Sequence, residues 1–136
     1  MSAPFHFELV APESLIFSGD VTEVIVPGAE GQFTVLAGHA PLIATLRPGI
    51  LHIHSAGKHQ EYFLQGGFAE VTPAGLAVLA EHAQPVEEID LAAFDSLIND
   101  LHDDISDAKT DAARIKAEEK LVHLLDMKQV LATRAA

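Results

Sequence analysis

The chain contains no cysteine and no tryptophan. Without a thiol it can form neither a disulfide framework nor a zinc–thiolate site, and thiol-based redox or nucleophilic chemistry is excluded. It also lacks any apolar run close to the roughly 20 residues that a membrane-spanning helix requires. We therefore predict a water-soluble protein with no direct membrane insertion.

Basic residues are also scarce. Eight Lys and Arg stand against 20 Asp and Glu in 136 residues, which gives a formal net charge of −12. Such an acidic surface repels nucleic-acid phosphates and anionic lipids, so we expect binding to neither. The start of the sequence, Met1 to Pro4, has neither the pattern of a signal peptide nor that of a transit segment. We expect a cytoplasmic protein that reaches a membrane only through a protein partner.

Residues 1–86 have the pattern of a β domain. Short β-branched or alternating segments, such as Phe5 to Leu9 and Val21 to Val26, are separated by Gly and Pro. About eight or more short strands, with turn signals every 8–12 residues, are typical of a sandwich or barrel. The Gly66-Gly67 pair marks an expected bend in a strand. We predict an N-terminal flattened β-sandwich.

Residues 87–136 have a helical period instead. Apolar residues recur every three or four positions in two runs, which places each set on one stripe of an α-helix. A polar segment from Ser106 to Asp111 separates the runs. We predict a C-terminal antiparallel α-helical hairpin, mobile because it has little core of its own, whose stripes are formed by Phe94, Leu97, Ile98, Leu101 and Ile105 and by Ala113, Ala117, Leu121, Leu124 and Leu131.

An ordered series of short motifs runs through the first domain. They occupy residues 13–19, 26–33, 38–42, 46–49, 66–71 and 78–81, and the most distinctive is Gly-His-Ala-Pro-Leu at 38–42. In this order and spacing they resemble the epsilon-subunit family of bacterial F-type ATP synthases. The resemblance covers the whole chain, although the helical half is similar only in pattern and length.

The resemblance implies a non-catalytic rotor subunit of the central stalk that needs no cofactor. In the family the sandwich lies against the gamma subunit and the c-ring, which couples proton translocation to ATP synthesis at the cytoplasmic face of the inner membrane. The helices, when extended, reach the alpha/beta hexamer and can inhibit ATP hydrolysis. Gln32 stands where the family often has an acid, which weakens a charged contact. By position we assign the ring-facing and gamma-facing edge to Glu30, Gln32, His39, Ala40, Pro41 and Leu42.

The resemblance also suggests a regulatory site. Some family members bind ATP through Ile/Leu-Asp-x-x-Arg-Ala at the start of the first helix, and this chain keeps Ile89 and Asp90 but has Ala93 in place of the Arg. Because Asp90 to Ile105 contains five aspartates and no Lys or Arg, we expect ATP sensing to be weak or absent. The second helix carries the candidate inhibitory residues Arg114, Lys116, Lys120 and Lys128, whose charge is nearly balanced by acids, so we expect modest inhibition.

Several residues allow other interpretations. His52, His54 and His59 are compatible with a metal site, but no carboxylate stands at a familiar ligand spacing, which favours ordinary strand residues and no metal. His39 has no nucleophile at a recognisable spacing. The acidic cluster of the first helix lacks the EF-hand pattern, which favours a solvated helix face. Two further classes stay open: an enzyme on a small β-barrel that uses these histidines, and an adaptor whose helices form a coiled coil with an unrelated partner.

Overall fold

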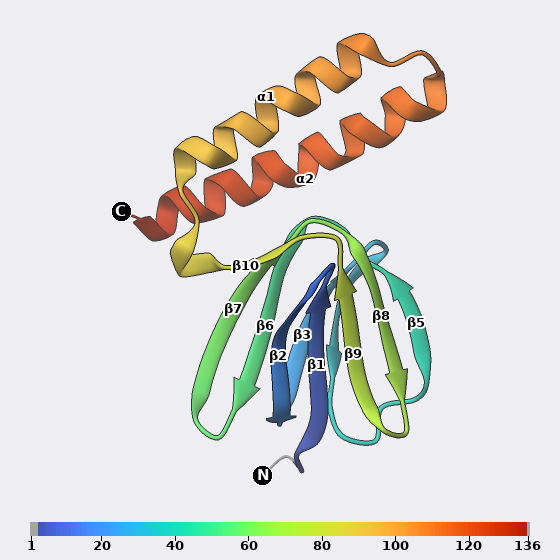
Figure 1. The fold of residues 1–136 in the computed structure, drawn as a ribbon, viewed down its shortest axis with the longest axis vertical. Coiled ribbons are helices and arrows are strands. Elements are labelled where there is room, and N and C mark those ends of the chain that lie inside the picture. The colour runs from blue at the N-terminus through green and yellow to red at the C-terminus, as the bar shows by residue number, and fades with distance from the viewer. Residues whose placement is uncertain (1–2, 136) are drawn as a thin grey trace. The chain divides into compact units, whose positions relative to one another are not determined.

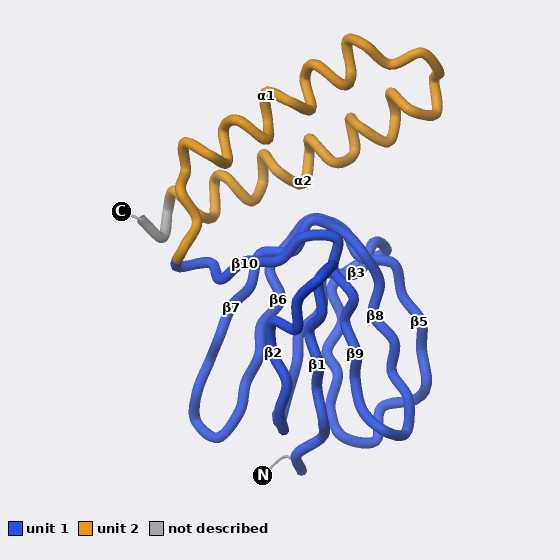
Figure 2. The backbone as a smooth tube through the Cα atoms, viewed as in Figure 1, with its two compact units in different colours: residues 1–87 blue, residues 88–136 orange. Residues whose placement is uncertain are grey.

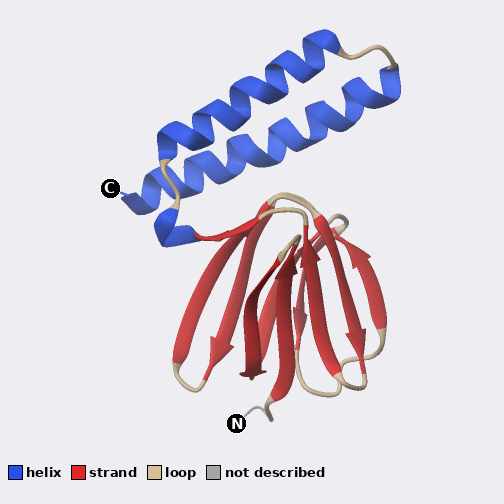
Figure 3. Ribbon diagram, in the orientation of Figure 1, coloured by secondary structure: helices blue, strands red, loops and turns tan. Residues whose placement is uncertain are grey.

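The structure, a computed structural model, describes the backbone of residues 3–135 and the side chains of residues 3–132. The chain divides into two compact units, residues 1–87 and 88–136 (Figure 2). Strands make up the first unit and helices the second, with a 3₁₀ helix, Val86–Glu88, at the boundary (Figure 3). The predicted fold class, a β-sandwich followed by a helical hairpin, is confirmed.

The first unit contains two five-stranded sheets (Figure 1). One has the order β2-β1-β9-β8-β5, with β1 and β9 parallel and the other neighbours antiparallel. Its strands are β1 (Phe5–Ala11), β2 (Ser14–Val21), β5 (Leu42–Thr45), β8 (Gly67–Thr72) and β9 (Gly75–Ala80). The other sheet has the order β10-β7-β6-β3-β4 and is antiparallel throughout. Its strands are β3 (Glu23–Gly28), β4 (Gly31–Val35), β6 (Gly49–Ser55), β7 (Lys58–Leu64) and β10 (Ala83–Pro85).

Alternation along the strands builds the core between the sheets. In β1, Phe7 and Leu9 are fully buried, whereas His6 is exposed and Glu8 is partly exposed. This period of two is expected where one face of a sheet meets the core and the other meets water. The core consists of Phe7, Leu9, Val21, Val24, Val26, Val35, Leu46, Leu51, Ile53, Leu64, Ala69, Val71, Leu76, Val78 and Ala80.

The Gly66-Gly67 pair is required where the chain enters β8. Both residues have positive φ, +131° and +114°, a conformation that side chains with a Cβ rarely adopt. A Cβ at Gly67 would also overlap the carbonyl oxygen of Leu79 on the neighbouring strand. Only glycine fits this close approach, in agreement with the bend predicted from the sequence.

The second unit consists of α1 (Leu91–Asp107) and α2 (Asp111–Ala135). In α1 the buried residues are Phe94 and Ile98, both on the predicted stripe. In α2 the buried residues follow a seven-residue spacing, the period of antiparallel helix packing: Ala117, Leu124 and Leu131. Ala113, predicted to lie on this stripe, is exposed, because it belongs to the first turn of α2.

The helix α2 has a second apolar face in addition to the predicted stripe. Ile115 is 51% exposed, Val122 57% and Leu125 46%. These residues follow one another at intervals of seven and three, so they share a face that is distinct from the buried stripe. One apolar face of α2 is therefore buried within the hairpin, and the other is exposed.

Candidate functional site

Two of the six predicted contact residues lie at one end of the sandwich. Glu30 is in the two-residue turn between β3 and β4, and Gln32 lies on β4; both are exposed. The backbone N–H of Ala29 donates to the carbonyl oxygen of Thr45 at 2.8 Å, which ties this turn to the last residue of β5. A hollow between the turn and β5 is lined by Glu30, Phe33, Leu42 and their neighbours.

The other predicted contact residues lie toward the far end of β4, although Leu42 also lines the hollow beside Glu30. His39, Ala40 and Pro41 form the loop that joins β4 to β5, and Leu42 is the first residue of β5. At about 3.3 Å per residue, the five residues of β4 separate this loop from Glu30 by about 15 Å. The six residues therefore follow one side of the sandwich, where β4 and β5 are the edge strands of their sheets, and do not converge on one point.

The surroundings of His39 do not form a catalytic site. Its Nδ1 lies 2.7 Å from the carbonyl oxygen of Ala40, and its backbone N–H donates to the carbonyl oxygen of Leu36 at 3.1 Å. The hollow beside it is lined by the segments 4–6, 35–39 and 71–75, and its one aliphatic hydroxyl, that of Thr72, accepts from the N–H of Ala74. No carboxylate lines this hollow among the described residues.

An apolar row crosses the outer face of the sheet that contains β1. Leu79 and Phe68 are paired across β9 and β8 and are 40% and 46% exposed, and Ile43, on the same face of β5, is 71% exposed. From Leu79 the row continues through Val10 on β1 to Leu15 on β2, at the opposite edge of the sheet. Four of its members, Phe68, Leu79, Val10 and Leu15, are directly paired across neighbouring strands. An exposed apolar band of this kind is typical of a surface that binds another protein.

The turn between β6 and β7 sets the register of a histidine-rich face. Ala56 and Gly57 both have positive φ, 45° and 80°, as a two-residue type I′ hairpin turn requires. Ser55 and Lys58 are therefore paired, and the residues before and after them follow in alternation. Two direct pairs on one face result: His54 with His59, and His52 with Glu61.

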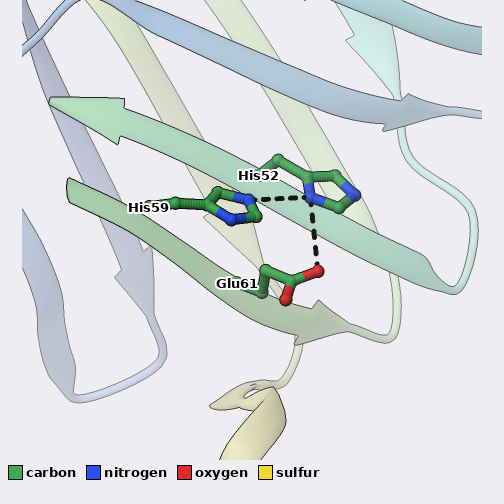
Figure 4. Close-up of side chains that lie close together, drawn as sticks. All are labelled: His52, His59 and Glu61. Atoms are coloured by element: carbon green, nitrogen blue, oxygen red, sulfur yellow. Dashed lines mark hydrogen bonds and ion pairs between the residues drawn. The ribbon is translucent and has the colours of Figure 1, made fainter. Parts of the chain in front are cut away.

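Three of these side chains converge (Figure 4). The Nδ1 atom of His52 lies 3.2 Å from Nε2 of His59 and 3.3 Å from Oε2 of Glu61. The rings of His54 and His59 stack with centroids 4.4 Å apart. Glu61 is thus a carboxylate partner of His52, although no carboxylate stands at a familiar ligand spacing in the sequence. Glu61 is distant from His52 in sequence, and only the hairpin register brings the two together.

The predicted regulatory residues lie just before α1 and on α2. Asp90 is the N-cap of α1, where its Oδ1 accepts a hydrogen bond of 3.0 Å from the N–H of Ala92. Arg114 forms ion pairs with Asp111 and Glu118 on its own helix. Lys128 Nζ lies 2.7 Å from Asp95 Oδ1 and links α2 to α1. Lys116 is exposed and Lys120 is partly exposed, while Ile89 precedes the cap and is partly buried.

The first unit matches a known domain. Residues 4–86 match the family model described as ATP synthase, Delta/Epsilon chain, beta-sandwich domain. The chain belongs to this family. Two epsilon-family relatives are the "ATP synthase epsilon chain" of Parvibaculum lavamentivorans, 47% identical over 96% of this chain and 100% of that protein, and that of Bradyrhizobium sp., 44% identical over 98% of each.

Solved structures agree with the epsilon-family assignment. A chain in the structure "Cryo-EM structure of Euglena gracilis mitochondrial ATP synthase, OSCP/F1/c-ring in rotational state 1" has a TM-score of 0.76 at 28% identity, over 96% of this chain and 83% of that one. A chain from the Tetrahymena thermophila mitochondrial ATP synthase, with a TM-score of 0.71 at 13% identity, shares the fold. The predicted identity, an epsilon-type and non-catalytic subunit of ATP synthase, is confirmed.

Within residues 3–135, neither helix combines the length and the apolar character that a membrane crossing demands.

Proposed function

We propose that this chain joins the gamma subunit to the c-ring in the central stalk of ATP synthase, at the cytoplasmic face of the bacterial inner membrane, and so helps to couple proton translocation to ATP synthesis. Its family membership supports this role. The single observation that carries the proposal is the exposed apolar row on the outer face of β5, β8, β9, β1 and β2.

Gamma is the partner that we assign to this apolar row. This face carries three large apolar side chains, Phe68, Leu79 and Ile43. In the isolated chain they are exposed to water, which is typical of a surface that binds another protein. Burying each of them would contribute about 1–3 kcal/mol to association, because apolar area is removed from water. A rotor subunit needs a permanent contact of this kind to turn together with its shaft.

The c-ring is the partner that we assign to the side formed by β4 and β5. Glu30 and Gln32 mark one end of that side, and the loop from His39 to Pro41 marks the other. These residues are polar or small and mostly exposed, as suits a contact with polar loops. The separation of the two ends, about 15 Å, would allow contact with more than one subunit of a ring.

The hairpin unit is the part that we assign to regulation. Lys116 and Lys120 lie one turn apart on α2, and neither forms an ion pair among the described residues, so both are available to acidic loops of the alpha/beta hexamer. Arg114 and Lys128 are already paired within the hairpin, which reduces their contribution. We therefore infer modest inhibition of ATP hydrolysis and, because α1 has no Lys or Arg, weak or absent ATP sensing.

A charge placed in the apolar row tests the gamma contact. Phe68→Asp should weaken binding of the purified chain to gamma at least about fivefold, since loss of one apolar anchor costs more than about 1 kcal/mol. Leu36→Asp is the matched control, because Leu36 has a similar exposure, 44% against 46%, but lies in the β4–β5 loop outside the row. Equal binding by wild type and Phe68→Asp would refute the assigned surface.

A further inference from the structure

We propose that the outer face of β6 and β7 binds a divalent transition-metal ion, with Zn²⁺ as the reference case, through His52, His59 and Glu61. Each residue offers one ligand atom, and the three atoms lie within 4.8 Å of one another. Among the described residues this is the one group of three or more such side chains that meets this condition. The site is independent of the stalk contacts assigned above.

Two of the three distances between ligand atoms match those around a tetrahedral ion, and the third is at most 4.8 Å. With metal–ligand distances of about 2.0–2.1 Å, two ligands of a tetrahedral zinc site are about 3.3–3.4 Å apart. The Nδ1 atom of His52 lies 3.2 Å from Nε2 of His59 and 3.3 Å from Oε2 of Glu61. An ion can enter once the side chains rotate so that their lone pairs face the metal instead of sharing a proton; the rings of His52 and His59 are now nearly parallel, 8° apart.

The donor set has the chemistry of a zinc site with an open position. Two imidazoles and one carboxylate are ligands that Zn²⁺ accepts, and a water molecule would complete four-coordination. Nitrogen-rich sites also favour Cu²⁺, Ni²⁺ and Co²⁺ over Mg²⁺ or Ca²⁺, which prefer oxygen ligands. We therefore expect selectivity for transition metals.

The scaffold holds the ligands before an ion arrives. All three project from two hydrogen-bonded strands whose register is fixed by the Ala56-Gly57 turn. His54 stacks on His59 with the ring planes 5° apart, which restrains the orientation of the His59 ring. Preorganisation of this kind reduces the entropy that binding must overcome.

The local charge also favours a cation. Glu23 on β3 pairs in register with His54, so a second carboxylate belongs to the same sheet face as Glu61. Glu61 and His52 are only 20% and 22% exposed as side chains, which strengthens their electrostatic interaction with an ion. Two carboxylates beside three imidazoles form a setting that attracts a divalent ion.

Zinc titration of the full-length chain tests the proposal. The wild type should bind one Zn²⁺ per chain in competition with a chromophoric chelator, and Co²⁺ should give the visible absorption of a tetrahedral complex. His59→Gln and Glu61→Gln should each weaken zinc binding at least about tenfold, because each removes one of three protein ligands. Zinc should raise the Tm of the wild type and leave that of both variants nearly unchanged.

Two further variants act as controls. His6 also has acidic neighbours, Glu8 at 3.1 Å and Asp20 at 3.8 Å, but they contact different ring nitrogens and do not converge, so His6→Gln should bind zinc like the wild type. His54→Phe should also retain binding, because it keeps the stacking ring without a ligand atom. Metal-free melting curves verify that every variant is folded. Zinc affinity that is equal in wild type, His59→Gln and Glu61→Gln would overturn the proposal, as would an equal loss in His6→Gln.

Discussion

At the scale of single residues, Asp90 has a structural role at a position where some family members bind ATP. Its carboxylate caps α1, and its backbone carbonyl accepts from the N–H of Phe94 at 3.0 Å. We predict that Asp90→Ala lowers the free energy of unfolding of the hairpin unit by about 1 kcal/mol, the usual effect of losing an N-cap. Thermal unfolding followed by circular dichroism at 222 nm measures it.

Asp100→Ala is the control for this prediction. Asp100 is an exposed aspartate in the middle of α1, far from the helix start, so its removal should change stability by less than about 0.5 kcal/mol. If Asp90 and Asp100 gave equal effects, capping would not be the role of Asp90. The two variants should also be alike in binding MgATP weakly or not at all, because α1 lacks the cation that a triphosphate needs.

Single residues are also where the sequence was least informative. Strand periodicity placed His52 and His54 on one face, but it could not indicate which residues of another strand lie opposite them. Ala56-Gly57 is a weak turn signal beside Asn-Gly, so the hairpin register, and with it Glu61, could not be predicted. The same limit concealed the fact that Glu30 and His39 lie at opposite ends of β4, since spacing in sequence does not give distance in space.

At the scale of elements, α2 contains adjacent leucines with different roles. Leu124 is 4% exposed and Leu125 is 46% exposed. We predict that Leu124→Ala destabilises the hairpin unit by about 2–3 kcal/mol, because it leaves a cavity in the contact between the helices. Leu125→Ala should change it by less than about 1 kcal/mol, since the side chain is half in water. Urea unfolding monitored by helical signal compares the two directly.

The same two variants distinguish the stability of the hairpin unit from its effect on ATP hydrolysis. If the exposed face of α2 binds another subunit, Leu125→Ala should reduce the effect of the tail on ATP hydrolysis while the hairpin stays folded. Equal loss of stability in both variants would instead mean that α2 has no preferred face in the isolated chain. Because both variants carry the same substitution, leucine to alanine, at neighbouring positions of one helix, the change in helix propensity is the same in both.

Elements were more predictable than residues. Gly and Pro separate nearly every strand of the first unit, and neither occurs after Pro85, so both the strands and the uninterrupted helices follow from the sequence. The buried stripe of α2 was also predicted, since Ala117, Leu124 and Leu131 recur at a helical spacing. Its second apolar face could not be predicted in the same way, because Ile115 and Val122 lie outside the predicted stripe and Ile115 lies between charged residues in the sequence.

At the scale of the whole molecule, β10 decides where the sandwich can be cut. It follows the last strand of the core and pairs with β7, so that Ala83, Gln84 and Pro85 lie opposite Leu64, Phe63 and Tyr62. Sequence patterns alone placed the end of the first domain at residue 86 but did not identify this short strand. A chain cut before β10 would expose the edge of β7, which carries two fully buried side chains, Phe63 and Leu64.

We therefore predict that a chain ending at Glu87 unfolds cooperatively and binds gamma with nearly the affinity of the full chain, because the apolar row and the core both lie within the first unit. A chain ending at His82, which lacks β10, should lose about 2 kcal/mol or more of stability and melt at least about 5 °C lower. Calorimetric melting and gamma binding of both chains measure this difference. If the shorter chain were as stable as the longer one, β10 would not belong to the folded sandwich. If the longer chain bound gamma much more weakly than the full-length protein, the contact would depend on the helices and the assigned apolar row would be wrong.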